Sequence, residues 1–162
     1  MHQPLHTEDL SRGGNGIPVT FDGRHARNIN LHEVWDTAIP RKANNLSQHS
    51  NARIEKAAAA VWAYRLAADL GSVDLSSECT LLADPDQCGI LWATETNKLV
   101  CSYVLAPGLD WIEHNDLGGA YYEGAVPIIE HQIKKGALRL AAWINAIADL
   151  VAQSEGLVKQ DL

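Results

Sequence analysis

The sequence predicts a mostly α-helical protein with one small β-hairpin near its amino-terminal end. Three observations support this fold class. Apolar residues recur every three or four positions along the carboxy-terminal part, which is the period of a helix that buries one face. Capping residues and prolines divide the middle of the chain into shorter helices. Glycine-rich turns around one β-prone run are confined to residues 8–25.

The hairpin, or an irregular loop in its place, is expected within residues 8–25. The run Val19-Thr20-Phe21 is β-prone, and the turn residues Asp22-Gly23 follow it directly. A second group of turn residues, Gly13 to Gly16, precedes it.

Several helices are expected after the hairpin, each with its own boundary signals. Asn30 is a favoured N-cap, Glu33 stands three residues later as in a capping box, and the helix should end before Pro40. Gly71 suits the C-cap of the second helix, and Pro107 follows the third. The fourth carries an apolar stripe that should face a core. The stripe is Val126, Ile129, Ile133, Ala137, Leu140, Ile144, Ile147 and Val151. The expected ranges are 30–39, 50–70, 90–105 and about 123–153.

Length and charge limit the classes of function. We expect one domain over residues 1–152 and a flexible tail over 153–162. A net charge of −7 argues against binding nucleic acid through a basic surface, because such binding neutralises phosphates. It leaves room for a nuclease whose positive charge resides in bound metal ions. We expect no membrane span and no signal peptide, because the apolar runs are short and the first residues are polar.

The cysteines leave two interpretations open. Cys79 and Cys88 flank a polar stretch that a disulfide could close into a loop. On spacing alone, free buried thiols in a cytosolic protein are an equal alternative. Cys101 is left over, and a leftover cysteine in a secreted protein suggests a partner elsewhere. Asn45 begins a glycosylation sequon, Asn45-Leu46-Ser47, although such triplets are common by chance.

His32 and Asp36 are the candidate metal ligands within a predicted helix. They lie four residues apart, so both side chains project from one face. Imidazole and carboxylate groups both bind zinc, and His6 could supply a third ligand from a loop. The spacing alone carries no information, because roughly one such pair arises by chance in this composition. A surface pair on a helix is therefore the simpler interpretation of the spacing.

An ordered series of motifs resembles the class I nucleases of plants and fungi. The series is His2-Gln3-Pro4-Leu5-His6, Arg12-Gly13-Gly14-Asn15, Asn30-Leu31-His32-Glu33-Val34-Trp35-Asp36-Thr37, Trp92-Ala93-Thr94-Glu95-Thr96 followed by Cys101, Gly119-Ala120-Tyr121-Tyr122, Pro127-Ile128-Ile129-Glu130 and Arg139-Leu140-Ala141-Ala142-Trp143-Ile144-Asn145. It covers about residues 1–148, and ordered matches over that length are far more specific than one motif. The resemblance implies a helical fold shared with bacterial zinc-dependent phospholipase C.

The resemblance also implies an activity and its site residues. Members of this family are secreted, often glycosylated enzymes that hold three zinc ions and cleave single-stranded DNA and RNA. Many also remove 3′-phosphates from nucleotides, and a complete member is expected to be a monomer. Matched residue by residue, His6, His32 and Asp36 would hold one zinc. Asn15 and the backbone near Arg12 would line a nucleobase pocket.

The cysteines and the start of the chain also have counterparts in this family. Cys79 and Cys88 resemble a loop disulfide of some fungal members, and Cys101 resembles a cysteine whose partner lies upstream. The family's Gly-Asp before the His-Gln-Pro-Leu-His motif, its other zinc ligands and its signal peptide would all precede Met1. We therefore expect a fragment or an internal methionine, a genuinely short protein being the rival interpretation.

An incomplete domain would have three consequences. We expect at most one zinc in this chain, little or no nuclease activity, and an apolar surface left exposed. A phospholipase C-like phosphoesterase and a non-catalytic remnant or secreted binding protein remain the alternative functions.

Overall fold

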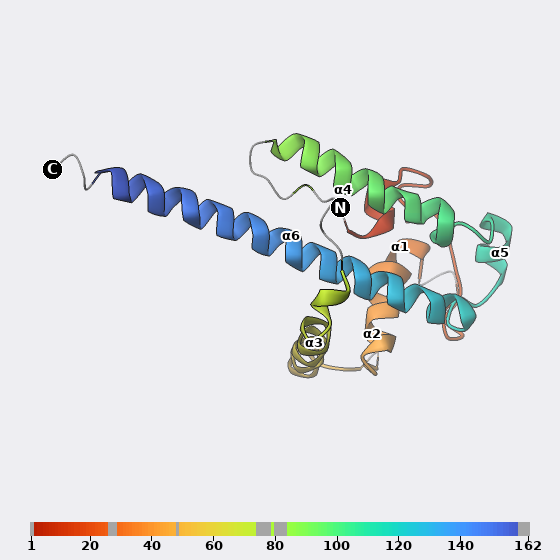
Figure 1. Ribbon diagram of the computed structural model, residues 1–162. Helices are drawn as coiled ribbons and strands as arrows, with labels where there is room; N and C mark the ends of the chain where they lie inside the picture. The colour runs from red at the N-terminus through yellow and green to blue at the C-terminus, as the bar shows by residue number, and fades with distance from the viewer. Residues whose placement is uncertain (1, 26–28, 48, 74–78, 80–83, 159–162) are drawn as a thin grey trace.

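The computed structural model describes residues 2–25, 29–47, 49–73, 79 and 84–158. Helices dominate this part of the chain, as the sequence predicts, and α6 crosses the whole molecule (Figure 1). The elements in order are the 3-10 turn η1 (Pro4–Thr7), α1 (Leu31–Glu33), the π-helical turn η2 (Val34–Ala38), α2 (Ile39–Ala43), α3 (Ala52–Ala67), the 3-10 turn η3 (Leu70–Ser72), α4 (Pro85–Leu99), the π-helical turn η4 (Val100–Val104), α5 (Leu109–His114) and α6 (Ala120–Val158). Within the described residues, no helix combines the length and apolar character needed to span a bilayer.

The predicted hairpin is reduced to isolated bridges in the described ranges. Phe21 and Arg24 exchange backbone hydrogen bonds of 3.0 and 3.1 Å across the Asp22-Gly23 turn. Both turn residues have positive φ, 49° at Asp22 and 74° at Gly23, a conformation that glycine adopts without strain. Two further bridges tie the segment to later parts of the chain, Pro18 with Asn30 and Thr20 with Asp116.

The hydrophobic core lies where α1, η2 and α2 meet the first turns of α6. Its buried members are Leu5, Ile17, Val19, Phe21, Ile29, Leu31, Val34, Trp35, Ala38, Ile39, Val104, Ile112, Leu117, Tyr121 and Ala125. Two polar atoms inside it have partners: Trp35 Nε1 donates to the Tyr121 hydroxyl, which donates to the Val104 carbonyl, each at 3.0 Å. Burial raises the pKa of Tyr121. Trp35 therefore fixes η2 firmly to α6.

The helix that starts at Asn30 begins as predicted but does not end before Pro40. The Asn30 side chain accepts the Glu33 N–H at 2.9 Å, as an N-cap should. The chain then widens into the π-helical turn η2, in which the Ile39 N–H bonds to the Val34 carbonyl. Pro40 falls in the first turn of α2, where its missing N–H is tolerated.

Two further helix boundaries correct the sequence prediction. α3 ends at Ala67, and Gly71 lies in η3 instead of capping α3. α4 begins at Pro85, earlier than the expected Ile90. Asp84 accepts the Gln87 N–H at 3.1 Å, so Asp84-Pro85 is an N-cap followed by an N1 proline.

α6 is longer than predicted and only partly covered. It runs from Ala120 to Val158, so residues 153–158, predicted as a flexible tail, are helical; 159–162 lie outside the described residues. Val126 and Ile129 pack against the core, as the stripe predicts. From Ile133 onward, the prediction that the stripe faces a core is wrong. The exposed fractions are 40% for Ile133, 62% for Leu140, 55% for Ile144, 49% for Ile147 and 52% for Val151. This confirms the expected exposed apolar surface, and Figure 1 shows this part of α6 extending beyond the other helices.

Candidate metal site

His6, His32 and Asp36 come together from three different elements. They lie on η1, α1 and η2, and one ligand atom from each lies within 4.8 Å of the others. His32 Nε2 is 3.2 Å from Asp36 Oδ2, and His6 Nε2 is 3.5 Å from Asp36 Oδ1. The two imidazole rings stack with centroids 5.0 Å apart. The structure thus brings together the three residues that the sequence analysis selected.

The ring of His32 is oriented by a backbone carbonyl from a distant segment. His32 Nδ1 lies 2.6 Å from the Gly13 oxygen. A carbonyl can only accept, so Nδ1 carries the hydrogen and, in the neutral ring, Nε2 presents its lone pair towards Asp36. Gly13 has a φ of 60°, and a Cβ there would lie 2.7 Å from the Leu5 oxygen. Close approach of backbone to backbone therefore requires glycine at this position.

Gly13 belongs to a left-handed run of four residues. The φ values are 49° at Ser11, 60° at Arg12, 60° at Gly13 and 80° at Gly14. Two of these residues carry side chains, and left-handed backbone at such residues costs about 1–2 kcal/mol each. Asn15 Nδ2 donates to the Arg12 carbonyl at 3.0 Å and so braces the run. The residues predicted to line a nucleobase pocket, Arg12 and Asn15, therefore share one strained and exposed loop beside His32.

Gln3 contacts two parts of the site and was not selected from the sequence. Its Oε1 accepts the Leu5 N–H and so caps η1, which carries His6. Its Nε2 donates to Asp36 Oδ1 at 2.8 Å. The available signal was its place between the two histidines of the first motif, directly before the proline at the start of η1.

Comparison with known proteins agrees with this arrangement. The family model described as S1/P1 Nuclease matches residues 1–149. This chain belongs to the S1/P1 nuclease family. It is 36% identical over 154 residues to nuclease S1 of Aspergillus oryzae, covering 91% of this chain and 50% of that protein. It is 37% identical to nuclease PA3 of a Penicillium species, covering 91% and 53%, and 32% identical to endonuclease 4 of Arabidopsis thaliana, covering 91% and 46%. The chain spans about half the length of the curated relatives that it matches.

An apolar cleft of about 270 Å³ opens beside Asp36 in this S1/P1 family member. It lies between the His2–Pro4 segment, η2 and α6. Its lining residues are His2, Gln3, Pro4, Trp35, Asp36, Pro40, Ile129, Gln132 and Ile133. The metal-ligand group therefore lies at the edge of a concave surface, as binding sites commonly do.

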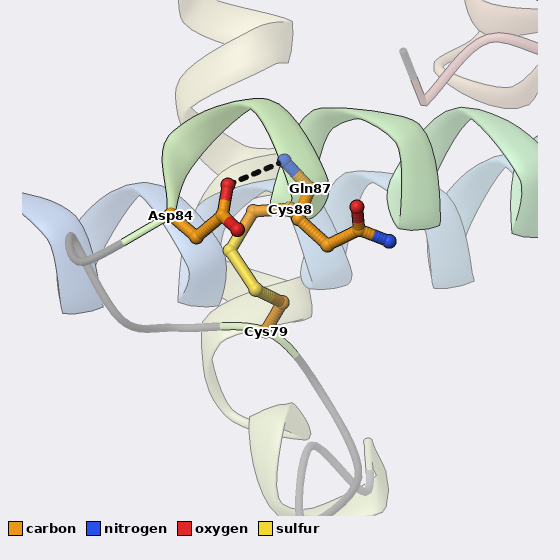
Figure 2. The surroundings of a disulfide bond; sticks show 4 residues. All are labelled: Cys79, Asp84, Gln87 and Cys88. Atoms are coloured by element: carbon orange, nitrogen blue, oxygen red, sulfur yellow. Dashed lines mark hydrogen bonds between the residues drawn. A yellow bond between two sulfur atoms is a disulfide. The ribbon is translucent and has the colours of Figure 1, made fainter.

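Two predicted covalent features lie on other segments of the S1/P1 family member. Cys79 and Cys88 form a disulfide with a Cα–Cα distance of 5.1 Å, which joins the segment before α4 to the first turn of α4 (Figure 2). Of the two interpretations of these cysteines, the disulfide is the one observed. Cys101 is exposed on η4 and has no disulfide partner among the described residues. Asn45 is exposed in the turn after α2, so its sequon is accessible, and the glycan stays a prediction.

Proposed function

We propose that this chain is part of a zinc-dependent endonuclease that hydrolyses phosphodiester bonds of single-stranded DNA and RNA. In this proposal His6, His32 and Asp36 hold one zinc ion. The convergence of their ligand atoms within 4.8 Å is the observation that carries it. Membership of the S1/P1 nuclease family supports the nuclease part of the proposal.

The chemistry of these donors fits zinc. Two imidazoles and one carboxylate, with a fourth position left open, form a donor set that zinc uses in catalytic sites. The hydrogen bond from His32 Nδ1 to the Gly13 carbonyl leaves Nε2 available as a ligand, which is the usual arrangement around zinc-bound histidine. Asp36 directs one oxygen towards His32 and the other towards Gln3 and His6.

The protein's own residues would bind and orient the nucleic acid. A bound zinc ion would polarise the phosphate and make water a better nucleophile near neutral pH. Asn15 and the backbone at Arg12 are proposed to receive a base. A base inside a duplex is held by stacking, so a site that must receive a base favours single strands. With a net charge of −7, the chain would depend on metal ions to attract phosphates.

We further propose that residues 1–162 alone bind at most one zinc and cleave nucleic acid weakly. The described residues offer a single three-residue group of this kind. A lone zinc lacks the neighbouring ion that clamps attacking and leaving oxygens in multi-zinc sites.

Zinc uptake tests the site directly. Purified chain is dialysed against limiting zinc, and bound metal is measured by mass spectrometry beside the variants His32→Ala and His114→Ala. His114 is a matched control, because it also lies four residues from an aspartate within a helix. We expect about one zinc in the wild type and in the control and none in His32→Ala. Absence of zinc from the wild type, or its equal loss from both variants, contradicts the proposal.

Substrate assays separate the candidate activities. The chain is incubated with single-stranded DNA, duplex DNA and phosphatidylcholine, with and without a chelator. Weak, chelator-sensitive cleavage of single strands that His32→Ala abolishes would support the nuclease. Strong cleavage of that kind would contradict only the proposed weakness of the isolated chain. Hydrolysis of the phospholipid alone would favour a phospholipase C-like enzyme, and a chain with neither zinc nor activity would be a non-catalytic protein.

Secretion is part of the same proposal, since the disulfide and the accessible sequon suit an oxidising compartment. Expression through the secretory route of a eukaryotic cell should give a glycosidase-sensitive band that Asn45→Gln removes. An unchanged band would reject the glycan at Asn45.

A further inference from the structure

We propose that Gln3 is a positioning residue of the metal site, which its side-chain amide organises by linking the turn that carries His6 to the carboxylate of Asp36. This inference rests on the proposed zinc site. It concerns how the ligands are held in place, and it assigns no ligand beyond the three already described.

The two ends of the Gln3 amide have different tasks. Oε1 accepts the Leu5 N–H at the start of η1, so it fixes the turn on which His6 lies. Nε2 donates to Asp36 Oδ1 at 2.8 Å. An ionised carboxylate only accepts hydrogen bonds, so this donor favours the ionised form that a metal needs. The other oxygen, Oδ2, then faces His32 Nε2.

The backbone around Gln3 is held from the helices behind it. Gln132 is only 4% exposed, and its Nε2 donates to the His2 carbonyl at 3.1 Å and to Thr96 Oγ1 at 3.0 Å. At the other end of η1, Asn97 Nδ2 donates to the Thr7 carbonyl at 2.6 Å. α4 and α6 therefore hold η1 at both ends. With its main chain held in this way, the Gln3 side chain can determine where the Asp36 carboxylate points.

Loss of this link should weaken metal binding more than folding. The Asp36 side chain is 39% exposed, so without its donor it can turn towards water. Ordering it again on metal binding then costs conformational entropy. Removing partners that orient metal ligands typically lowers metal affinity by roughly 10–100-fold.

Two substitutions separate the two ends of the amide. Gln3→Ala removes both hydrogen bonds. Gln3→Asn keeps a side chain that caps helical turns well, but it is one methylene shorter and does not reach Asp36. Gln153→Ala, on the exposed end of α6, is the matched control. Zinc affinity is measured by competition with a chromophoric chelator, the melting temperature by circular dichroism, and ligand geometry by the visible bands of bound Co²⁺.

We expect Gln3→Asn to bind zinc about tenfold more weakly, with altered Co²⁺ bands and an unchanged melting temperature. Gln3→Ala should bind at least as weakly, and Gln153→Ala should match the wild type. Wild-type affinity in Gln3→Asn would overturn the inference, because capping alone would then explain the residue. Loss of affinity together with loss of the folded signal would assign Gln3 to folding and also overturn it.

The wild type separates this inference from the function on which it rests. A wild-type chain that takes up no zinc rejects the metal site and, with it, the role of Gln3. A wild-type chain that binds zinc as strongly as both Gln3 variants rejects the inference alone.

Discussion

Two histidine–aspartate pairs in this protein have the same spacing and different surroundings. His32 and Asp36 lie 3.2 Å apart across α1 and η2, and Asp110 and His114 lie 3.4 Å apart on α5. The side chains of the first pair are 18% and 39% exposed, whereas those of Asp110 and His114 are 100% and 71% exposed. The spacing brings imidazole and carboxylate together in both places, so it cannot by itself distinguish a metal site from a surface pair.

The difference lies in what other segments contribute. His32 Nδ1 is held by Gly13 from a separate loop, while His114 Nδ1 contacts the carbonyl of Asp110 in its own helical turn at 2.8 Å. His6 joins the first pair, whereas no third metal-binding side chain joins the second among the described residues. A ligand set held by distant backbone is already ordered before the metal arrives, and this lowers the entropic cost of binding.

His6→Ala should break the distinction most strongly, because it leaves His32 and Asp36 as a two-ligand pair like Asp110 and His114. Zinc binding by four-ligand sites is worth about 10–16 kcal/mol, so one ligand accounts for about 3 kcal/mol, or roughly a hundredfold in affinity. Calorimetric titration with zinc measures the change. Unchanged affinity would mean that the metal binds elsewhere.

Gly13→Ala should have the next largest effect, because it disturbs the carbonyl that orients His32. Gly23→Ala is the matched control, since Gly23 also has positive φ but a Cβ there would meet nothing within 4 Å. Both variants should lose about 1–2 kcal/mol of unfolding free energy through backbone strain. Only Gly13→Ala should also lose roughly tenfold in zinc affinity. Equal zinc affinities in the two variants would contradict the role of the Gly13 carbonyl.

Asn30→Ala tests whether the helix start beneath His32 matters beyond stability. Loss of an N-cap costs about 1 kcal/mol, which urea denaturation can measure. Asn51→Ala removes the corresponding cap of α3, where the Asn51 side chain accepts two backbone N–H groups. We expect similar losses of stability, with a small fall in zinc affinity for Asn30→Ala alone. An equal fall in Asn51→Ala would show that the zinc effect is only a general loss of stability.

The smallest effect concerns Asp116, a carboxylate two residues beyond the α5 pair. Burial tends to raise its pKa, but hydrogen bonds from the backbone N–H groups of Gly118, Gly23 and Asp22 outweigh burial and lower the pKa below 3.8. A lowered folded-state pKa stabilises the fold above the unfolded-state value, and this is lost as pH falls through the folded-state value. The gap in unfolding free energy between wild type and Asp116→Asn should therefore shrink as the pH falls below 3.8. A gap that stays constant with pH would contradict this.

Local patterns predicted the parts of the site that depend on local geometry. Asn30 as a cap and the helical period placed His32 and Asp36 on one face, and the structure agrees. The family resemblance supplied His6, because nothing local indicates that η1 lies against α1. Gln3 was missed for the same reason, since its contact with Asp36 joins residues 33 positions apart.

Helix boundaries failed where one rule was overridden by another. Asp84-Pro85 is a helix start, but the polar residues around it favoured a loop. Pro40 should stop a regular helix, and the π-helical turn that accommodates it has no simple sequence signature. The period of the α6 stripe was right, whereas its burial from Ile133 onward depends on what packs against it, which periodicity does not reveal.

The π-helical turn makes the site sensitive to chain length as well as to residue identity. η2 contains Asp36 and is followed directly by α2, whose Lys42 donates to the Gly118 carbonyl at 2.7 Å. Deleting one residue from η2 would convert it into ordinary α-helix and rotate everything after it by about 100° relative to His32. Lys42 would then point away from Gly118. A single missing codon in this segment would thus detach the metal-binding face from the loop behind it, even with every ligand still encoded.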